Sequence, residues 1–416
     1  MKTRIILIMF SLQCGFLFGC CKEIPPEPVK PKPKDSTAKL EVVWHALFRP
    51  NGKGGYFHDP VFAADQYIVL AGKNQEFAVY NKQTGKRHSA WTSNQIISEI
   101  SRIKNCEVVG KNKDIILIYS GDALFAYSLH SGQRLWTLPI PNSGQVRMSA
   151  TEEHAFVSYG PGALSKSWYR LAIVDVYSGE KRDVLELYAE DNYDFDINPP
   201  SAYVIGGDTL LFFTTGGWNF SAVKGRVYAY CYNLTKKEMV WTNKQFTIDT
   251  DVSSAQPPPF VIENDKLIVT SMRAIHCFNM HTGDLIWQRE GLSFPDRPPL
   301  YWEGKLYIRY GNPNFLLCLD AQSGQQLWEN SKLQQATPAP DGSMAIYKDK
   351  LYFTAWGPNA SHYLICVDIH TGEKLWSDYG PAGSVMFGVL IDQETGYMYC
   401  NTGASMFCVD LNKTKK

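Results

Sequence analysis

The sequence is short of the features that usually point directly to a function. Its 416 residues carry no net charge, because Lys and Arg total 41 and Asp and Glu also total 41. A balanced chain has no strong electrostatic field to attract nucleic acid. No stretch of more than about twelve residues shows the apolar spacing of an amphipathic helix. We therefore expect no nucleic-acid partner and little α-helix.

What the sequence has instead is one short pattern, repeated eight times. The clearest copy reads Leu-Cys-Leu-Asp-Ala-Gln-Ser-Gly-Gln-Gln-Leu-Trp and spans residues 317–328. The copies recur every 41 to 58 residues when they are aligned on their Asp, Asn or Ser, at Asn81, Ser128, Asp175, Asn233, Asn279, Asp320, Asp368 and Asp410. A period of this length, with strand-like sequence inside it, is typical of a β-propeller.

Residues 299–328 show how one repeat would fold. Runs of β-branched and aromatic residues alternate there with Gly, Asn and Pro, which indicates four short strands joined by turns. The Asp or Asn before a turn can accept bonds from nearby backbone, and the Gly can adopt a positive φ. We predict an all-β fold, an eight-bladed β-propeller of four-stranded antiparallel blades over residues 39–416. The alternative is a β-sandwich, which the recurring Asp-to-Trp spacing disfavours.

The last repeat predicts how the ring closes. It runs from Phe407 through Asp410 to Asn412 without reaching a Trp, whereas residues 40–44, Leu-Glu-Val-Val-Trp, have the character of a detached last strand. We predict that Trp44 completes the eighth blade beside the strand that ends near Asp410. The propeller would then be closed by N- and C-terminal strands, which removes free sheet edges.

The repeat, Ala/Cys-x-Asp-x-x-Ser/Thr-Gly-x-x-x-Trp, resembles that of pyrroloquinoline-quinone-type (PQQ-like) propellers. This family includes quinoprotein alcohol dehydrogenases and the propeller lipoprotein of the outer-membrane β-barrel assembly machinery. The resemblance covers about residues 40–416, and it implies that the Trp of each repeat docks across neighbouring blades. The docking residues would be Trp44, Trp91, Trp136, Trp241, Trp287, Trp328 and Trp376.

Three repeats depart from this pattern. Asp183 stands where the third repeat should have its Trp, and Lys237 replaces the turn Gly of the fourth. Trp91 comes two residues late, which would leave its side chain on the same face of a strand.

The N-terminal residues are typical of an exported lipoprotein. Residues 1–19 combine a basic start with a short apolar run, as in a signal peptide. The sequence Leu-Phe-Gly-Cys at 17–20 resembles a lipobox, which implies lipidation at Cys20. An uncut membrane anchor is the alternative, but the run is short for spanning. Residues 20–38 are rich in Pro and Lys and predict an extended tether. We expect an outer-membrane lipoprotein of the bacterial cell envelope, facing the periplasm or the cell surface.

The cysteines and histidines fit structural roles. Five cysteines lie two residues before the Asp or Asn of their repeats: Cys231, Cys277, Cys318, Cys366 and Cys408. Equivalent positions in successive blades would lie farther apart than the roughly 7 Å between Cα atoms that a disulfide allows. We expect these residues to be buried, and Cys106 and Cys400 to be free thiols. His130, His281 and His370 share one turn position, which predicts exposure to solvent and not a metal site.

One acidic segment is a weak metal candidate. Asp194, Asp196 and Asn198 alternate in the longest connection between repeats, so in an extended segment they would face one side. Their oxygens suit Ca²⁺, but no glycine-bearing calcium loop matches. A solvated loop is the simpler interpretation, and we predict no metal.

Catalytic motifs are missing from the sequence. It contains no Gly-x-Ser-x-Gly, His-Glu-x-x-His or phosphate loop. By resemblance, a quinoprotein dehydrogenase would need a pair of adjacent cysteines at its cofactor, and the one such pair, Cys20-Cys21, lies in the export signal. We predict a protein that is not an enzyme and binds no cofactor. The alternative is a quinone-dependent dehydrogenase, or a lyase or hydrolase whose residues are spread over several blades.

Large aromatic residues mark a candidate binding face. In a propeller, the connections between blades share one face with those between second and third strands, and the Ser-Gly and Thr-Gly turns lie opposite. Exposed aromatic residues on loops indicate contacts with proteins or sugars, although the rings could also fold over the blade tops. The candidates are Trp168, Tyr169, Trp218, Phe220, Asp296, Arg297, Trp356 and Tyr363.

Taken together, these features predict a lipid-anchored propeller of the cell envelope that acts as a non-catalytic protein-binding scaffold. Its partner would be another envelope protein, and it would contact the membrane only through its lipid. We expect a monomeric propeller within a larger complex. A glycan-binding surface lipoprotein is a further alternative.

Overall fold

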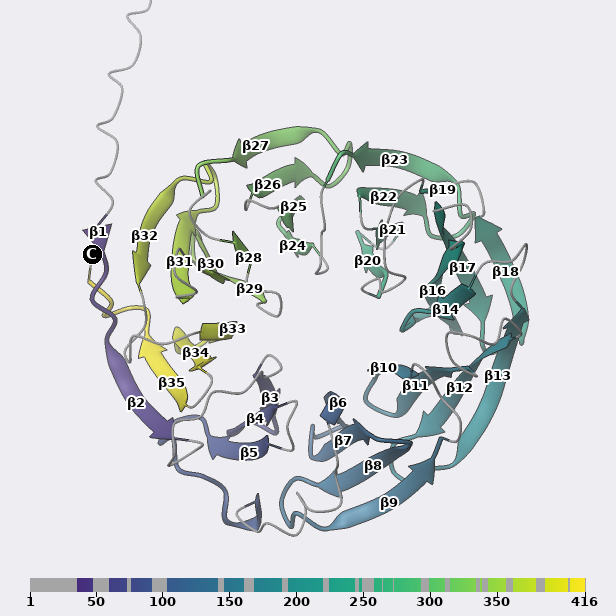
Figure 1. The fold of residues 1–416 in the computed structure, drawn as a ribbon, viewed down its shortest axis with the longest axis horizontal. Helices are drawn as coiled ribbons and strands as arrows, with labels where there is room; N and C mark the ends of the chain where they lie inside the picture. The colour runs from purple at the N-terminus through teal and green to yellow at the C-terminus, as the bar shows by residue number, and fades with distance from the viewer. Residues whose placement is uncertain are drawn as a thin grey trace, which may run out of the picture. The chain divides into compact units, whose positions relative to one another are not determined.

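The strands of the computed structural model form eight sheets, which are the eight blades of a ring (Figure 1). The structure describes residues 36–47, 60–72, 76–91, 103–140, 146–160, 168–188, 194–219, 224–243, 247–248, 258–263, 265–271, 273–292, 299–310, 315–333, 337–338, 343–356, 362–378, 386–402 and 405–415. All of them belong to the unit from Asp35 to Lys416. The predicted all-β, eight-bladed propeller is confirmed.

Blades one to three follow chain order from the inside of the ring to the outside, and blade four has the same order with two additional strands (Figure 1). Blade one has β3 (Val61–Ala63), β4 (Tyr67–Gly72), β5 (Glu76–Asn81) and the short 3₁₀ helix η1 (Ser89–Trp91). Blade two has β6 (Ile103–Val109), β7 (Ile115–Ser120), β8 (Ala123–Ser128) and β9 (Arg134–Pro139). Blade three has β10 (Val146–Ala150), β11 (His154–Tyr159), β12 (Trp168–Asp175) and β13 (Lys181–Tyr188). Blade four has β14 (Asp194–Ile197), β15 (Ser201–Ile205), β16 (Asp208–Asn219), β17 (Lys224–Asn233), β18 (Glu238–Asn243) and β19 (Thr247–Ile248).

The remaining blades continue around the ring. Blade five has β20 (Phe260–Ile262), β21 (Lys266–Thr270), β22 (Ala274–Asn279) and β23 (Leu285–Glu290). Blade six has β24 (Leu300–Trp302), β25 (Lys305–Tyr310), β26 (Phe315–Asp320) and β27 (Gln326–Asn330). Blade seven has β28 (Thr337–Pro338), β29 (Met344–Tyr347), β30 (Lys350–Trp356), β31 (His362–Asp368) and β32 (Lys374–Asp378), with β1 (Ser36–Thr37) outside it. Blade eight has β33 (Met386–Asp392), β34 (Tyr397–Thr402), β35 (Ser405–Asp410) and β2 (Val42–Leu47).

The residues of each strand match its place in the blade. Every residue of β7, β21 and β35 is buried, because neighbouring blades cover both faces of the middle strands. Strands covered on both faces are expected to be continuously apolar. In the outermost strands β2 and β9, exposed and half-buried residues alternate instead, because one face of these strands meets solvent.

The hydrophobic core lies between the blades. The buried apolar side chains form eight clusters, and each cluster combines two neighbouring blades. In the cluster between blades four and five, for example, Cys231 and Trp241 pack with Phe278. Cys231, Cys277, Cys318, Cys366 and Cys408 are all buried and none of the five forms a disulfide, as predicted. Burial raises the pKa of the Cys231 thiol to about 12, so it remains protonated and unreactive.

The ring closes as the sequence predicted. Strand β2 pairs antiparallel with β35, and Trp44 lies opposite Cys408. The N-terminal segment also contacts blade seven, because Ser36 and Thr37 of β1 lie parallel to Trp376 and Ser377 of β32. Between these two strands, Lys39 and Lys415 exchange backbone hydrogen bonds, so both ends of the described chain are held at the seam between blades seven and eight.

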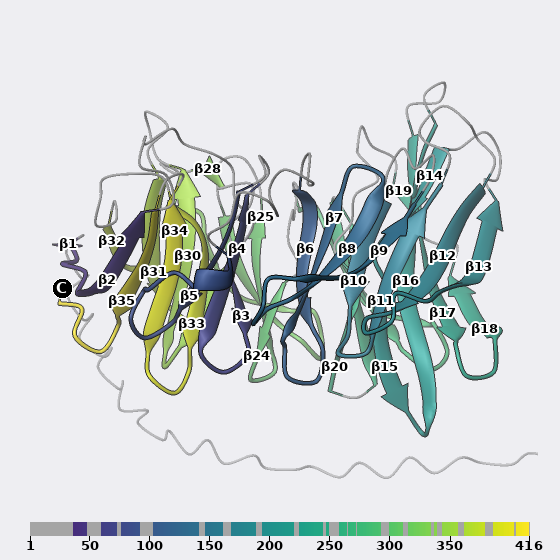
Figure 2. The ribbon, with the colours of Figure 1, turned by 90° about the horizontal axis from the view of Figure 1, so that it is seen from below.

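The ring has two distinct faces, which Figure 2 shows from the side. We call the lower edge in that view the turn face; it contains the turns between first and second strands and between third and fourth strands. The opposite edge, where β14, β19 and β28 are labelled, is the loop face. Among the described residues, η1 is the single helical segment, and no helix has the length and apolar character needed to cross a membrane.

Candidate functional site

The predicted docking tryptophans join neighbouring blades through one recurring hydrogen bond. In six of the seven, the indole N–H donates to a backbone carbonyl in the next blade, one residue after the repeat's Asp, Asn or Ser. These pairs are Trp44 to Lys82 (2.9 Å), Trp91 to Leu129 (2.6 Å), Trp136 to Val176 (3.0 Å), Trp241 to Met280 (2.9 Å), Trp287 to Ala321 (3.2 Å) and Trp328 to Ile369 (3.1 Å). We call this arrangement an indole lock. Trp376 is 3% exposed and packs in the cluster between blades seven and eight.

The turn glycine is part of the lock. Gly324 has a φ of +69°, and a Cβ on it would lie 2.6 Å from the indole of Trp287. Real Cβ atoms do not approach a ring so closely, so both the backbone conformation and the space require glycine. The same close approach to an indole occurs at Gly85, Gly179, Gly283 and Gly372.

Trp91 forms its indole lock from a 3₁₀ helix and not from the predicted strand. It does not lie on a strand, because the two additional residues coil the chain into η1, where the Trp91 N–H bonds the His88 carbonyl at 3.1 Å. The side chain is nevertheless 3% exposed. The prediction that Trp91 occupies the same face of a strand was therefore wrong, and the described residues of blade one form three strands.

Blade three differs in the position of its β-bulge. In blade four the bulge follows Cys231, which lies opposite Trp241, but in blade three it lies between Leu171 and Ala172. Asp183 consequently lies opposite Ala172, whose side chain packs toward blade two, and Val184 packs toward blade four. The position that aligns with the other tryptophans by sequence has thus moved to the opposite face of the sheet.

Asp183 belongs to a polar network on the outer part of blade three. Its carboxylate accepts hydrogen bonds from the Tyr159 hydroxyl at 2.8 Å and from Lys181 Nζ at 3.1 Å, and Lys181 also bonds Tyr159 at 2.7 Å. Partial burial acts to raise the pKa of Asp183, but the bonds from Tyr159 and Lys181 hold it below its usual value. The carboxylate therefore stays ionised at neutral pH.

Trp168 of the predicted binding face adjoins this network. It begins β12 at the loop-face end and is half-buried, with the Arg170 guanidinium 4.5 Å from its ring centroid. Glu186 pairs with Arg170 and holds it over the ring. Tyr169, by contrast, is 7% exposed and packs into the cluster between blades three and four.

For three other predicted face residues, the structure describes the position of the backbone. The backbone of Trp218 lies in β16, opposite Asp194 of β14 and Gly225 of β17. The backbones of Trp356 and Tyr363 lie at the adjoining ends of β30 and β31, where Trp356 is opposite His362. Phe220, Asp296, Arg297 and Cys20 lie outside the described residues.

Blade four extends farther than the others toward the loop face. The end of β16 and the start of β17 pair with each other, and β14 and β19 flank them. These four segments form a small antiparallel sheet labelled at the upper edge in Figure 2. It contains Asp194, Asp196 and Trp218, so the longest connection between repeats builds a raised platform.

The third member of the predicted metal set has another role. Asn198 is fully buried, and its side-chain amide donates to the Thr214 hydroxyl at 3.0 Å. Asp194 and Asp196 lie on β14, two residues apart. Within the part of the chain that the structure describes, no three His, Cys, Asp or Glu side chains are grouped as metal ligands would be. His130, His281 and His370 are exposed, as predicted.

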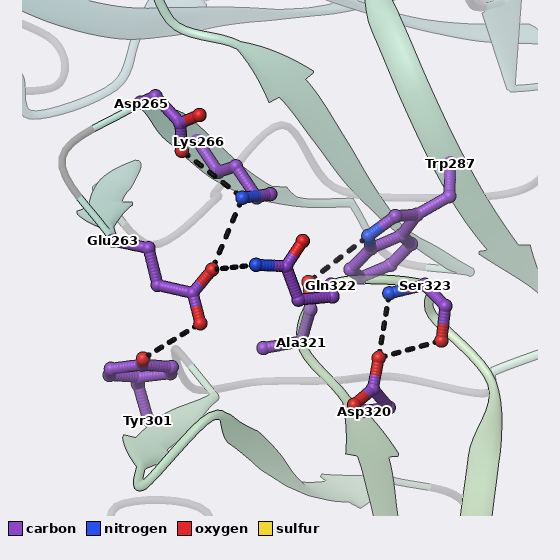
Figure 3. Close-up of polar contacts among 9 residues, drawn as sticks. All are labelled: Glu263, Asp265, Lys266, Trp287, Tyr301, Asp320, Ala321, Gln322 and Ser323. Atoms are coloured by element: carbon purple, nitrogen blue, oxygen red, sulfur yellow. Dashed lines mark hydrogen bonds and ion pairs between the residues drawn. The ribbon is translucent and has the colours of Figure 1, made fainter.

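The turn face holds a polar cluster between blades five and six (Figure 3). Glu263 lies in the turn before β21. Its Oε2 accepts bonds from Lys266 Nζ at 3.1 Å and from Gln322 Nε2 at 2.7 Å, and its Oε1 accepts one from the Tyr301 hydroxyl at 3.2 Å. Gln322 follows directly on Ala321, the acceptor of the Trp287 lock. The cluster therefore reinforces a seam that an indole already joins.

An ion pair occupies the equivalent place at the seam where the ring closes. Lys82 of blade one approaches Asp392 of blade eight at 2.9 Å, and the Asp392 side chain is 8% exposed. Burial acts to raise the pKa of Asp392, but the bonds from Lys82 and from the backbone of Thr395 hold it below its usual value. Sequence reasoning missed this residue, although Asp392-x-x-Thr-Gly396 repeats the turn motif and could have revealed it.

Comparisons with known proteins agree with this geometry. A PQQ-type family model described as outer membrane protein assembly factor BamB matches residues 223–386. A search of curated protein sequences found no match.

Several solved structures are similar in fold. BamB from Moraxella catarrhalis has a TM-score of 0.61 at 13% identity, covering 90% of this chain and 100% of that one. The quinohemoprotein alcohol dehydrogenase from Comamonas testosteroni has a TM-score of 0.61 at 11% identity, covering 89% and 76%. The computationally designed Ika8 protein has a TM-score of 0.61 at 12% identity, covering 90% and 100%. The chain is thus similar to PQQ-like repeat propellers, including BamB, which confirms the resemblance predicted from its repeat.

Proposed function

We propose that this protein is a lipid-anchored propeller of the bacterial cell envelope that acts as a non-catalytic scaffold and binds another envelope protein through its loop face. The observation that carries the proposal is the arrangement of Trp168 and Arg170 at the loop end of blade three. Tryptophan, tyrosine and arginine dominate the binding energy of protein interfaces. Here Glu186 holds the guanidinium over the indole, so little side-chain freedom would be lost on binding.

The match of residues 223–386 to a family model described as an outer membrane assembly factor supports the same proposal. The loop face would also include Trp218 on the platform of blade four, Trp356 on blade seven, and the segment with Asp296 and Arg297. Tyr169 faces the core, so we assign it a packing role beneath this surface.

The anchor is proposed from the sequence. Lipidation at Cys20 would place the propeller at the outer membrane. The tether would end before residue 36 and not at 38 as the sequence predicted, because Ser36 and Thr37 pair with blade seven and Ala38 is buried. Replacing Cys20 with Ser should release the protein from the membrane fraction or leave it as an uncleaved precursor. Unchanged fractionation together with an unchanged mass would contradict lipidation at this residue.

The binding face is tested by comparing substitutions on the two faces. Trp168→Ala, Trp218→Ala and Trp356→Ala should each reduce crosslinking of an envelope partner by tenfold or more, because interface tryptophans commonly contribute about 2 kcal/mol or more. The matched controls on the turn face are Lys86→Ala and His281→Ala, which should leave crosslinking unchanged. If the control substitutions abolish the crosslinks and the tryptophan substitutions do not, the working surface is the turn face.

A quinone-dependent dehydrogenase is the second candidate. The likeness to the quinohemoprotein alcohol dehydrogenase favours it, but at 11% identity that likeness concerns the fold alone. Direct addition of the cofactor distinguishes the two functions.

A further inference from the structure

The outermost strands share an aliphatic residue that the repeat pattern does not explain. In six blades the residue just before the docking Trp forms a β-bulge, so it has no partner on the neighbouring strand. Five of these residues are 40–48% exposed: Val43, Leu135, Val240, Ile286 and Leu327. We call them the rim aliphatics. Single exposed aliphatic residues are ordinary on protein surfaces, and what distinguishes these five is that they recur at one position of the blade.

Blade seven differs from the other blades at this position. Its equivalent, Leu375, is half-buried and packs against the core cluster between blades seven and eight. Here the N-terminal segment lies beside the outer strand, with Ser36 and Thr37 of β1 parallel to Trp376 and Ser377, and Ala38 3% exposed. An extended strand can therefore pair with the backbone of the outer strand of a blade, and on this blade both Ala38 and Leu375 belong to the packing of one core cluster. The bulge is no obstacle, because blade seven has the same bulge.

The outer strands differ in how they are protected from strand addition. Exposed sheet edges usually carry lysine, proline or clustered charge, which prevents pairing with other chains. Strand β9 ends in Pro139, and β13 begins with Lys181, Arg182 and Asp183. The outer strands β18, β23 and β27 of three consecutive blades contain neither Lys nor Pro, as is also true of β2, and their charged residues are Glu238, Arg289, Glu290 and Glu329. On β18 and β23, moreover, Met239 and Leu285 are 36% and 43% exposed beside the rim aliphatics.

We propose that the outer strands of blades five and six form a second docking surface, which receives an extended β-strand of a partner protein. The partner strand would hydrogen-bond to the outer backbone edge, as β1 does on blade seven, and its apolar side chains would cover Ile286 or Leu327. This mode of recognition obtains affinity from main-chain bonds and specificity from alternate side chains. The surface lies on the flank of the ring, where Figure 1 shows β23 and β27 outermost, so it is distinct from the loop face.

The test uses the full-length protein and a dye-labelled synthetic peptide of residues 36–41, the extended segment that covers blade seven. Fluorescence anisotropy should show saturable binding, and hydrogen exchange should show new protection of amides in β23 and β27. Replacing both Ile286 and Leu327 with Lys should weaken peptide binding by tenfold or more. Both residues are exposed, so circular dichroism melting should confirm that the double variant remains folded.

The control variant is Val204→Lys, at an aliphatic residue that is 76% exposed but lies on β15, away from the rim. It should bind the peptide as the unaltered protein does. The proposal is overturned if the peptide does not bind at up to about 1 mM, or if the double variant binds it equally well. It is also overturned if sedimentation shows a dimer that the double variant dissolves, because the occupant of the rim would then be a second copy of this protein.

Discussion

Val184 of blade three and Lys237 of blade four lie on the two sides of one seam, and each occupies the place of one half of an indole lock. Lys237 keeps the left-handed backbone of the turn, with a φ of +60°. Within the described residues of this seam, Val184 packs where a tryptophan would lie, so the space above the turn is not filled by an indole. Loss of the ring removes the steric requirement for glycine, and the two departures therefore belong together.

This relationship predicts opposite outcomes for substitutions at equivalent turns. Gly324→Lys should lower the free energy of unfolding by at least about 2 kcal/mol, because a Cβ would collide with Trp287 and the residue would still need a positive φ. Lys237→Gly should change it by less than about 1 kcal/mol, since no ring lies over that turn. Thermal melting of both variants measures the difference. Equal effects would show that the lock does not determine the turn residue.

Removing the strand that closes the ring should destabilise the whole propeller. A chain that begins at Pro50 lacks β2 and Trp44, so blade eight loses its outer strand and the adjoining seam loses its lock. Trp44→Ala alone should cost about 3–5 kcal/mol, as for other large-to-small changes in a core. Val43→Ala is the matched control, because that neighbouring side chain is 40% exposed. A shortened chain that melts at the temperature of the intact propeller would contradict closure by β2.

The buried His276 should make stability depend on pH. It is 2% exposed, and burial lowers its pKa to about 4. Below pH 6.5 the unfolded chain takes up a proton on this imidazole and the folded chain does not. The contribution of neutral His276 to the free energy of unfolding is therefore fully present above pH 6.5 and is lost as pH falls toward 4. The loss should reach about 3 kcal/mol.

A His276→Met variant isolates this effect. Urea unfolding of both proteins between pH 7.5 and pH 4.5 should show that the variant loses less stability than the unaltered protein. If both proteins lose the same stability between pH 7.5 and pH 4.5, His276 is protonated in the folded state over this range.

A cofactor test separates the scaffold from a quinone-dependent enzyme. We expect that pyrroloquinoline quinone with Ca²⁺ will neither raise the melting temperature nor support dye-linked oxidation of alcohols. A ligand at a hundred times its dissociation constant would stabilise the folded protein by about 2.7 kcal/mol. A saturable gain in stability of that size, together with alcohol oxidation, would contradict the scaffold function and support the dehydrogenase.

Much of the architecture could be read from local sequence because the repeat carries its own geometry. The Asp-to-Trp spacing, the turn glycines and the small residue opposite each Trp were enough to predict eight blades and closure through Trp44. The candidate binding site could be predicted less well. Trp168 and Tyr169 are neighbours in sequence, but they lie on opposite faces of β12. The aromatic character that selected both does not distinguish a residue of the binding face from a core residue.

The sequence by itself determined the ring, because each repeat specifies the strands, the turn and the side chains that must meet the next repeat. Tertiary structure alone decided three other features. It decided that the bulge of blade three moves and turns Asp183 toward blade two, that two extra residues before Trp91 coil into η1, and that Leu375 is covered while Ile286 and Leu327 are exposed. These features depend on which segment packs beside a strand, and that neighbour can come from any part of the chain.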